Sequence, residues 1–472
     1  MPLYVLPSLA ICALQLHSRF NSSTRINELV TVWTSQASAK QRAGRAGRTS
    51  AGLCFRLYPQ AFFDECLPQQ TTPEILRSPL DDIVLQLCLL YEHCADRNTE
   101  SNGVCPVNFL SNTPEAPPEQ KVFEASQHLL EVGAVDITAV APRALYRLTP
   151  LGYHLSRLPM DAKIGKVLIV GSLLGCLDNA LTIAAVLSHT KSIFYSTLTL
   201  NKEERAFILN SRKQMIENGF GGPKWIGGTV KSDLTVVIAA YREWSKKKGR
   251  QKFSFCQSNG LDATALSDIK SLRDQFLQYL QIFGFESNHS NDHNEDALLT
   301  SCCIVSGLYP NVSTLIRPRK GGPRGGARLL TKTGEMSRAS SDSFQVDRLR
   351  TASETGKDAY AVFHSKHQGI GTNDQPSQVY LSQVNFVPRY ALLLFSGDLV
   401  IRNNCIVLDG WLKFKIGSAD KDRAGGALLI YALRQELDQM VLDYVAGSEA
   451  SQQQTSKRQT LLQMIRRLLE GE

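Results

Sequence analysis

The sequence lacks every pattern that would build a metal or disulfide framework. Its 11 cysteines are scattered, none forms a Cys-x-x-Cys pair, and no Cys/His cluster has the spacing of metal ligands. This excludes zinc-type sites and predicts no metal site. It favours reduced thiols, many packed as small hydrophobic side chains, in an intracellular compartment. A cytoplasmic or nuclear location fits best, and an organelle is a further option.

A phosphate-cradling loop of the Gly-x-x-x-x-Gly-Lys-Ser/Thr type is also missing. The two Gly-Lys pairs, at residues 165–166 and 356–357, lack the glycine-rich approach whose backbone amides surround phosphates. These 472 residues therefore hold no loop of their own for a nucleoside triphosphate.

No apolar run satisfies the requirements of a signal peptide or a membrane span. The apolar residues 2–16 are preceded by no basic residue, which argues against a secretory signal. Residues 167–187 approach spanning length, but Asp178 and Asn179 interrupt them and leave two segments too short for a bilayer. We expect buried helices there and no membrane partner.

What the sequence does have is the composition of an ordinary globular protein. It is 43% hydrophobic and 20% charged, and a chain of this length needs several cores. The net charge of +8 suits a polyanionic partner, although a solubility feature explains such an excess equally well. Polar stretches at residues 95–120, 286–297 and 317–343 divide the chain, and the last of these is Gly-rich and basic.

The first half of the chain carries helical signals around a short hairpin. A helix is predicted over 78–90, with Ser78 as N-cap, and another over 121–134, ended by Gly133. Residues 146–159 read as a strand and then a helix capped by Thr149. With an excursion near 135–145, this order predicts a small winged-helix unit.

The second half changes from helical to strand periodicity. Between 161 and 285 we expect helices, and after 299 strands that form a compact barrel, followed by helices at the end of the chain. The expected helices are 161–175, 177–188, 201–217, 232–246 and 262–283. The expected strands include "VYLSQVNF", "YALLLFSGDLVI" and "CIVLDGWLKFKI". In the last of these, Trp411, Lys413 and Lys415 should share one face.

The most informative stretch is "SQASAKQRAGRAGR", residues 35–48. On a helix over 38–48, Gln41, Arg45 and Arg48 would share one face. Two guanidiniums on one face can both bind a phosphate group and neutralise charge on a transferring γ-phosphoryl group. Gly44 and Gly47 each cost a helix about 1 kcal/mol relative to alanine, which makes sense where a nucleotide or another backbone approaches closely. A solvated basic helix is the alternative, and it leaves the glycines unexplained.

This stretch resembles motif VI of the DEAH/RHA group of superfamily-2 helicases. Further along, "PEILRSPLDDIVLQL", "LLEVGAVD", "YRLTPLGYHLSRLPMDAKIGKVLIVGSLLGCLDNALTIAAVLS", "SDLTVVIAAYREW", "SGLYPNV" and "ALLLFSGDL" resemble later segments of the same family. Together they span residues 17–445 in the family's order and spacing.

The resemblance implies a multidomain α+β fold and an activity that couples ATP hydrolysis to 3′-to-5′ movement along RNA. It implies that Gln41, Arg45 and Arg48 contact the γ-phosphate of ATP held with Mg²⁺, and that Arg42 is structural. The implied divisions are a remnant of the second RecA-like domain (1–60), a winged helix (61–160), a helical ratchet or helicase-associated domain (161–285), an OB-fold with a basic inserted loop (299–418) and C-terminal helices (419–472).

The sequence also departs from the family. It has no DEAH-type acidic motif, no first RecA-like domain and little of the second. Where family members carry a His-Pro-Ser-Ser type stretch, this chain has only "VFHSKHQG". We therefore expect this chain to be the C-terminal part of an RNA helicase that does not hydrolyse ATP, or bind it well, alone.

A second hypothesis is a non-catalytic RNA- or protein-binding module. It rests on the Trp411/Lys413/Lys415 face and on a basic loop with Arg317, Arg319, Lys320, Arg324 and Arg328. Backbone-dominated RNA binding needs such cations, and an exposed tryptophan can stack on a base. A solvated loop and a tryptophan packed under the last helix are the competing interpretations. Ribonucleoprotein or adaptor partners are further expectations.

Overall fold

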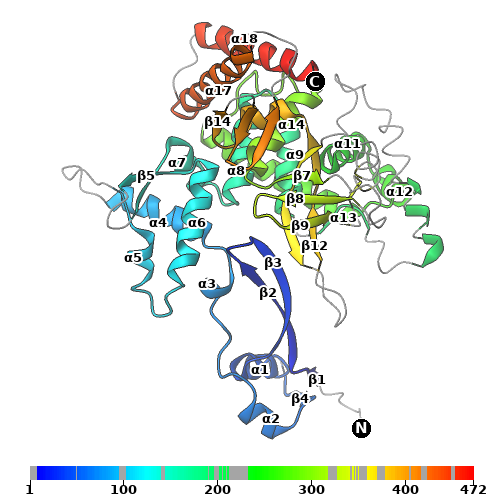
Figure 1. The fold of residues 1–472 in the computed structure, drawn as a ribbon. Coiled ribbons are helices and arrows are strands. Elements are labelled where there is room, and N and C mark those ends of the chain that lie inside the picture. The colour runs from blue at the N-terminus through cyan, green and yellow to red at the C-terminus, as the bar shows by residue number, and fades with distance from the viewer. Residues whose placement is uncertain are drawn as a thin grey trace, which may run out of the picture. The chain divides into compact units, whose positions relative to one another are not determined.

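The computed structural model describes most of the chain (Figure 1). The described residues are 8–48, 50–94, 103–139, 144–189, 191–195, 201–204, 206–208, 210–211, 232–316, 327–340, 343–344, 346, 349, 359–368, 378–402, 405–415, 423–447 and 452–471. They form two compact units, one of Met1–Leu80 with Pro106–Ala125, the other of Asp81–Cys105 with Ser126–Glu472.

The first unit has a small sheet and a hairpin. Strand β1 (Ser8–Ile11) pairs in parallel with β4 (Leu53–Arg56), and β2 (Leu14–Asn21) pairs antiparallel with β3 (Ile26–Trp33). Helix α1 follows β3, and Ala39 of this helix packs against Phe63 and Leu67. The helices are α1 (Gln36–Ala43), α2 (Gln60–Glu65), α3 (Glu74–Arg77), α5 (Pro106–Leu110) and the first residues of α6 (Glu119–Val132). Because α2 belongs to the core around Ala39, this unit continues past residue 60, where the sequence predicted a domain boundary.

The second unit begins with the helices and hairpin expected near residues 78–159. Helix α4 (Asp81–Cys94) is joined to α6 by a 2.5 Å contact between Asp81 Oδ1 and His128 Nδ1. Strands β5 (Val135–Ala139) and β6 (Leu145–Leu148) form an antiparallel pair. The Thr149 side chain caps α7 (Pro150–Arg157), as the sequence predicted. Val104 forms an additional antiparallel bridge with Tyr146, so the hairpin has a third short segment on its edge.

Three helices that are apolar on nearly every side form the centre of this unit. They are α8 (Ala162–Leu173), α9 (Leu177–Ser188) and α14 (Ala297–Leu308). Gly175, at φ +76°, makes the turn between α8 and α9. The predicted 161–175 and 177–188 helices are therefore confirmed as a buried pair. Among the described residues, no helix is both long and apolar enough to cross a membrane.

Helices at the side of this centre follow the expected pattern, with one addition. Helices α11 (Asp233–Lys246) and α13 (Ala263–Ile282) match the predicted 232–246 and 262–283. A further helix, α12 (Arg250–Asn259), was not predicted. The predicted helix over 201–217 lies partly outside the described residues, although 202–204 and 206–208 are helical.

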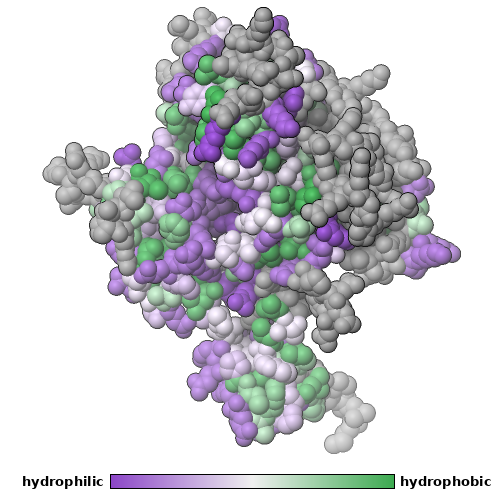
Figure 2. Space-filling view, in the orientation of Figure 1, coloured by the Kyte–Doolittle hydropathy of each residue, from purple (hydrophilic) through white to green (hydrophobic). Residues whose placement is uncertain are grey.

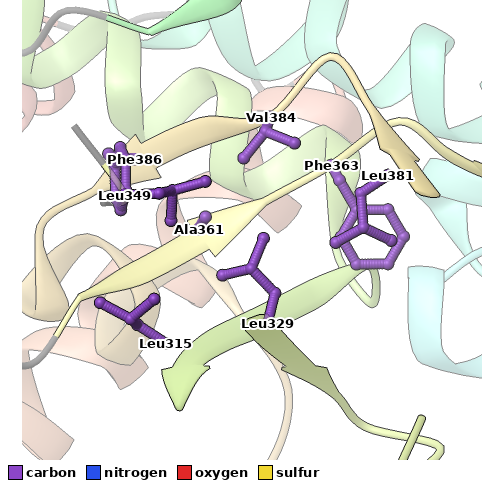
Figure 3. Close-up of a cluster of buried hydrophobic side chains, with 8 residues drawn as sticks. All are labelled: Leu315, Leu329, Leu349, Ala361, Phe363, Leu381, Val384 and Phe386. Carbon is purple, nitrogen blue, oxygen red and sulfur yellow. The ribbon is translucent and has the colours of Figure 1, made fainter. Parts of the chain in front are cut away.

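Seven short strands after residue 311 are paired in the order β13-β10-β7-β8-β9-β12-β11. They are β7 (Val312–Ile316), β8 (Arg328–Thr331), β9 (Met336–Ala339), β10 (Tyr360–Val362), β11 (Ser365–Gln368), β12 (Val379–Ser382) and β13 (Asn385–Val387). Strand β11 follows directly after β10 in the chain, and β13 follows directly after β12. At one end of the order β10 pairs with β13, and at the other end β11 pairs with β12. The sheet therefore closes on itself, around the buried cluster in Figure 3 that includes Leu329, Phe363 and Leu381.

Two predicted strand regions are helical. Residues 299–308 belong to α14, and "YALLLF" belongs to helix α16 (Arg389–Phe395), after which β14 (Leu399–Arg402) begins. Both helices are buried on nearly all sides, so they show no polar face from which a helical period could be recognised. Strands β14, β15 (Cys405–Leu408) and β16 (Leu412–Lys415) form a separate antiparallel sheet.

The chain closes with helices α17 (Arg423–Val445) and α18 (Gln452–Glu470). Helix α17 is joined to four earlier segments of the second unit. The Tyr444 hydroxyl donates to Phe285 O (2.8 Å) and contacts Ser172 Oγ (2.9 Å), His154 Nε2 lies 3.1 Å from Val445 O, and the Arg434 guanidinium donates to Leu393 O (3.1 Å).

Candidate phosphate-binding segment and nucleic-acid interface

Helix α1 starts at a well-defined cap. The Ser35 hydroxyl accepts a hydrogen bond from Ser38 N (3.0 Å) and lies 2.9 Å from the Thr71 hydroxyl. Ser35 has the extended backbone of an N-cap, and only 1% of its surface is exposed. The start of α1 is thereby fixed to the remainder of the first unit.

Two backbone amides at the start of α1, which have no partner within the helix, donate hydrogen bonds to carbonyls elsewhere in the first unit. Gln36 N donates to Pro68 O (2.8 Å), and Ala37 N donates to Gln69 O (3.1 Å). The Gln36 side chain adds a hydrogen bond to Phe63 O (2.9 Å). Helix N-termini commonly bind phosphate through such amides, but here they are occupied. Any anion chemistry in this segment must therefore come from the opposite end of the helix.

That end is shorter than the sequence predicted. The helix ends at Ala43, and the following amides form i→i+3 hydrogen bonds, Arg45 N to Arg42 O and Ala46 N to Ala43 O, each 3.1 Å. Arg45 and Arg48 therefore follow the helix in a turn and do not share a helical face with Gln41, and the expected helix over 38–48 is wrong in its second half. Glycines at 44 and 47 explain the difference, because glycine loses the most backbone entropy in a helix.

Neither glycine is explained by contact with another part of the protein. A Cβ built on Gly47 has no heavy atom within 4 Å, and one on Gly44 meets only carbonyls of its own helix, the nearer being Gln41 O at 3.5 Å. The predicted approach of a second backbone is thus not found among the described residues. The approach of a nucleotide stays a prediction.

The side chains of this turn are exposed and uncompensated. Gln41, Arg45 and Arg48 are exposed, whereas Arg42 is half-buried. Residues 36–48 contain four basic residues and no acidic one. Within the described residues, no ion pair or hydrogen bond engages the Gln41, Arg45 or Arg48 side chain. The Arg45 and Arg48 guanidiniums and the Gln41 amide are therefore hydrated and can pair with an anion.

The donors of this segment fit a phosphate and do not fit a cation. Guanidinium and amide groups donate to phosphate oxygens, but Mg²⁺ needs oxygen ligands, usually with a carboxylate among them. Among the described residues, no group of three His, Cys, Asp or Glu side chains is placed to hold a metal ion. The residues present thus fit one side of a nucleotide's phosphates and provide no Mg²⁺ site.

The residues predicted to contact RNA fall into two groups. Arg317, Arg319, Lys320 and Arg324 lie outside the described residues. Arg328 is exposed at the start of β8, with one guanidinium nitrogen 3.8 Å from Met336 Sδ.

The β14–β16 sheet brings a set of cations together. Lys413 and Lys415 are exposed on β16, while Leu412 and Phe414 are buried, as the alternation predicted. Trp411 differs from the prediction, because it lies in the turn before the strand and is half-buried. Cys405 pairs with both Arg402 and Lys415, so Arg402, which the sequence reading missed, shares the face of the two lysines.

This basic face (Arg402, Lys413 and Lys415) has apolar neighbours. Val400 on β14 is 43% exposed and belongs to the same face, because residues that alternate along a strand point to the same side. Figure 2 shows hydrophobic and hydrophilic residues next to one another where Figure 1 places β14. Arg402 could have been assigned to this face from the sequence only by predicting that β14 pairs with β15.

Comparison with known proteins finds a family match for part of the chain. Residues 161–270 match the family described as "Helicase associated domain (HA2), ratchet-like". The match begins where the sequence predicts the helical ratchet region to begin. Together with the relatives below, this match makes the chain similar to the C-terminal part of DEAH-type RNA helicases, as the resemblance of its motifs indicated.

Particular relatives agree along almost the whole chain. It is 30% identical over 434 residues to the ATP-dependent DNA/RNA helicase DHX36 of Bos taurus, and 31% identical over 439 residues to the DExH-box ATP-dependent RNA helicase DExH1 of Arabidopsis thaliana. It is 29% identical over 497 residues to the putative ATP-dependent RNA helicase DHX57 of Mus musculus. These matches cover 89%, 91% and 96% of this chain and 38%, 38% and 32% of the relatives. The chain thus spans between about a third and two fifths of their length.

Proposed function

We propose that this chain works as the C-terminal part of an ATP-dependent RNA helicase and supplies the arginines that face the γ-phosphate. The observation that carries the proposal is the turn after α1, where Arg45 and Arg48 are exposed and no acidic residue lies between 36 and 48. A segment of this charge is stable when hydrated and gains most from a polyanion.

The role of each residue follows from its donors. Arg45 and Arg48 would neutralise charge on the γ-phosphoryl oxygens, and Gln41 would donate from its amide to a phosphate oxygen or orient the attacking water. ATP and Mg²⁺ would supply the phosphoryl group and its charge compensation. Other parts of a helicase must hold both, because this chain has neither a phosphate-cradling loop nor a Mg²⁺ site among its described residues. We expect no RNA-stimulated ATP hydrolysis from these 472 residues alone.

We further propose that the hairpin region is a winged helix and that the closed sheet is an OB-fold. The winged helix is supported by α4, α6 and the β5–β6 hairpin with its extra bridge at Val104. The OB-fold is supported by the strand count. If β10 with β11, and β12 with β13, are each taken as one broken strand, the seven short strands form a closed sheet of five. Among the pairs that strands β7 to β13 form with one another, β9 with β12 is the one parallel pair. Such barrels commonly bind oligonucleotides.

The test is hydrolysis by the longest natural protein that contains this chain. Arg45→Ala and Arg48→Ala should each lower RNA-stimulated kcat by about 10³-fold or more, as expected for an arginine that contacts the transferring phosphoryl group. Lys40→Ala is the matched control, because Lys40 is also an exposed cation of the same segment. Equal activity of the Arg45→Ala protein and the control would refute the assignment.

A non-catalytic RNA-binding module is the second candidate, and the basic face on β14–β16 favours it. Three cations on one sheet face can follow a phosphate backbone, and their contribution must fall as salt rises. RNA affinity of the purified chain should be measured at two salt concentrations for the wild type and for Lys413→Ala/Lys415→Ala. The double variant should bind more weakly and with a shallower salt dependence. If the wild type does not bind RNA at low salt, this candidate is excluded.

Location and partners follow as proposals of the same kind. All eleven cysteines are free thiols, which supports a reducing intracellular compartment. Adaptor or ribonucleoprotein partners are expected of a helicase that must be directed to particular RNAs.

A further inference from the structure

An apolar pocket with an acidic rim opens beside helix α12. Its residues lie between 195 and 263 in the sequence, so they belong neither to the basic face nor to the turn after α1. Its volume is about 730 Å³. The floor is formed by Ile208, Cys256 and Leu261, which are 6%, 2% and 0% exposed. The pocket is built by local contacts, because Tyr195 N donates to Gly260 O (3.2 Å) and Gly260 adopts φ +62° at the end of α12.

Three aromatic side chains line the pocket beside this floor and stay exposed to solvent. Phe253, Phe207 and Tyr195 line the pocket and are 67%, 54% and 46% exposed. An isolated exposed aromatic residue needs no explanation, but three around one concave site are typical of a binding surface. Aromatic walls around a closed apolar floor suit a bulky apolar side chain of a partner.

The charges at the rim decide the kind of partner. Glu203 and Glu204 line the pocket, and burial, with a smaller contribution from the charge of Asp262, raises the pKa of the Cys256 thiol in its floor. Glu204 also accepts from Asn201 N (3.2 Å), which fixes its carboxylate near the rim. The Glu203 carboxylate has no partner among the described residues. Lys252, next to Phe253 in the chain, lies over the Trp244 ring at 3.7 Å.

We propose that this pocket docks a basic protein segment that inserts one aromatic or branched aliphatic side chain between Phe207 and Phe253. Lysine or arginine residues beside that anchor would pair with Glu203 and Glu204. A nucleic acid could stack a base on the same aromatic rings, but its phosphates would face the carboxylates at the rim. The charge therefore selects a peptide and not RNA, which separates this surface from the RNA-binding role of the family.

The probe is a blocked peptide, Lys-Lys-Ala-Trp-Ala-Lys-Lys, titrated into the 472-residue chain by calorimetry. Two comparison peptides replace the lysines by glutamates or the tryptophan by alanine. We expect saturable binding of the basic tryptophan peptide below about 1 mM. Each comparison peptide should bind about tenfold more weakly, since one lacks the complementary charge and the other the anchor.

Variants locate the binding in the pocket. Phe253→Ser and Glu203→Lys change exposed side chains, so the protein should fold, and each should weaken the basic peptide about fivefold or more. Phe109→Ser is the control, because Phe109 is a 51% exposed aromatic residue of helix α5, outside the pocket. The proposal is overturned if the wild type does not bind, if the acidic peptide binds equally well, if a single-stranded RNA competes for the site, or if Phe253→Ser behaves as the control.

Discussion

Gly307 in helix α14 offers the most direct test of how the buried helices pack. A Cβ at this position would lie 2.0 Å from Val167 Cγ2 on α8 and 3.0 Å from Lys163 O. Carbon atoms normally pack at about 3.5–4.0 Å. Val167 is 0% exposed, so its methyl group has no free space to enter, and Lys163 O belongs to the backbone of α8. The Gly307→Ala change therefore forces α8 and α14 apart.

The expected magnitude combines two opposing effects. Overpacking a buried site costs about 1–3 kcal/mol and sometimes more. Replacing glycine by alanine inside a helix returns about 0.5–1 kcal/mol. Because the clash shortens a normal contact by well over an ångström and involves backbone, we expect the upper part of the first range. The net loss in the free energy of unfolding should be about 1–2.5 kcal/mol.

The assay is urea unfolding followed by circular dichroism, with Gly426→Ala in helix α17 as the matched control. Gly426 is exposed and has no atom within 4 Å of a built Cβ, so alanine there should leave the midpoint unchanged or raise it. Gly307→Ala should lower the midpoint. If Gly307→Ala is as stable as Gly426→Ala, the close approach of α8 and α14 at this position is refuted.

Two other changes give further tests. Burial, together with the charge of Lys163, lowers the pKa of His364 to about 4. The unfolded chain binds this proton near pH 6.5, so stability should fall as the pH decreases from about 6.5 to 4. His364→Asn should flatten this part of the urea-midpoint profile, and an unchanged profile would contradict the cause. Gly397→Ala would place a Cβ 2.0 Å from both Tyr309 Oη and Asp409 Oδ1, where the Tyr309 hydroxyl donates a hydrogen bond to Asp409 Oδ2. It should lower thermal stability, and Tyr309→Phe should reduce this effect in the double variant; additive effects would argue against a clash.

Prediction from sequence succeeded where a local signal decides the structure. Thr149 followed by a proline specifies the start of α7, and Gly133, at φ +82°, ends α6 as expected. The alternation of Leu412, Lys413 and Phe414 fixed which side of β16 is buried. In each case one or two residues carry the signal, so distant parts of the chain need not be known.

Prediction failed where tertiary burial overrides the local pattern. Residues 389–395 and 297–308 are buried almost all round, and such runs look alike as strand or helix. In the candidate site the roles of Gln41, Arg45 and Arg48 stay predictions, but the expected end of α1 was wrong. Gly44 and Gly47 were visible in the sequence, but they were interpreted as points of close approach and not as the end of the helix.

The position of α17 in the chain has a consequence for biosynthesis. Through Tyr444 and Arg434, this helix contacts Ser172, Phe285 and Leu393, and each of these precedes its partner in α17 by at least 41 residues. A ribosome releases residues in order, at about 5–20 per second. The central helices therefore emerge before the helix that covers them, and their native contacts are completed only when residue 445 has left the exit tunnel. During that interval, chaperones would have access to apolar surface that the finished protein does not present.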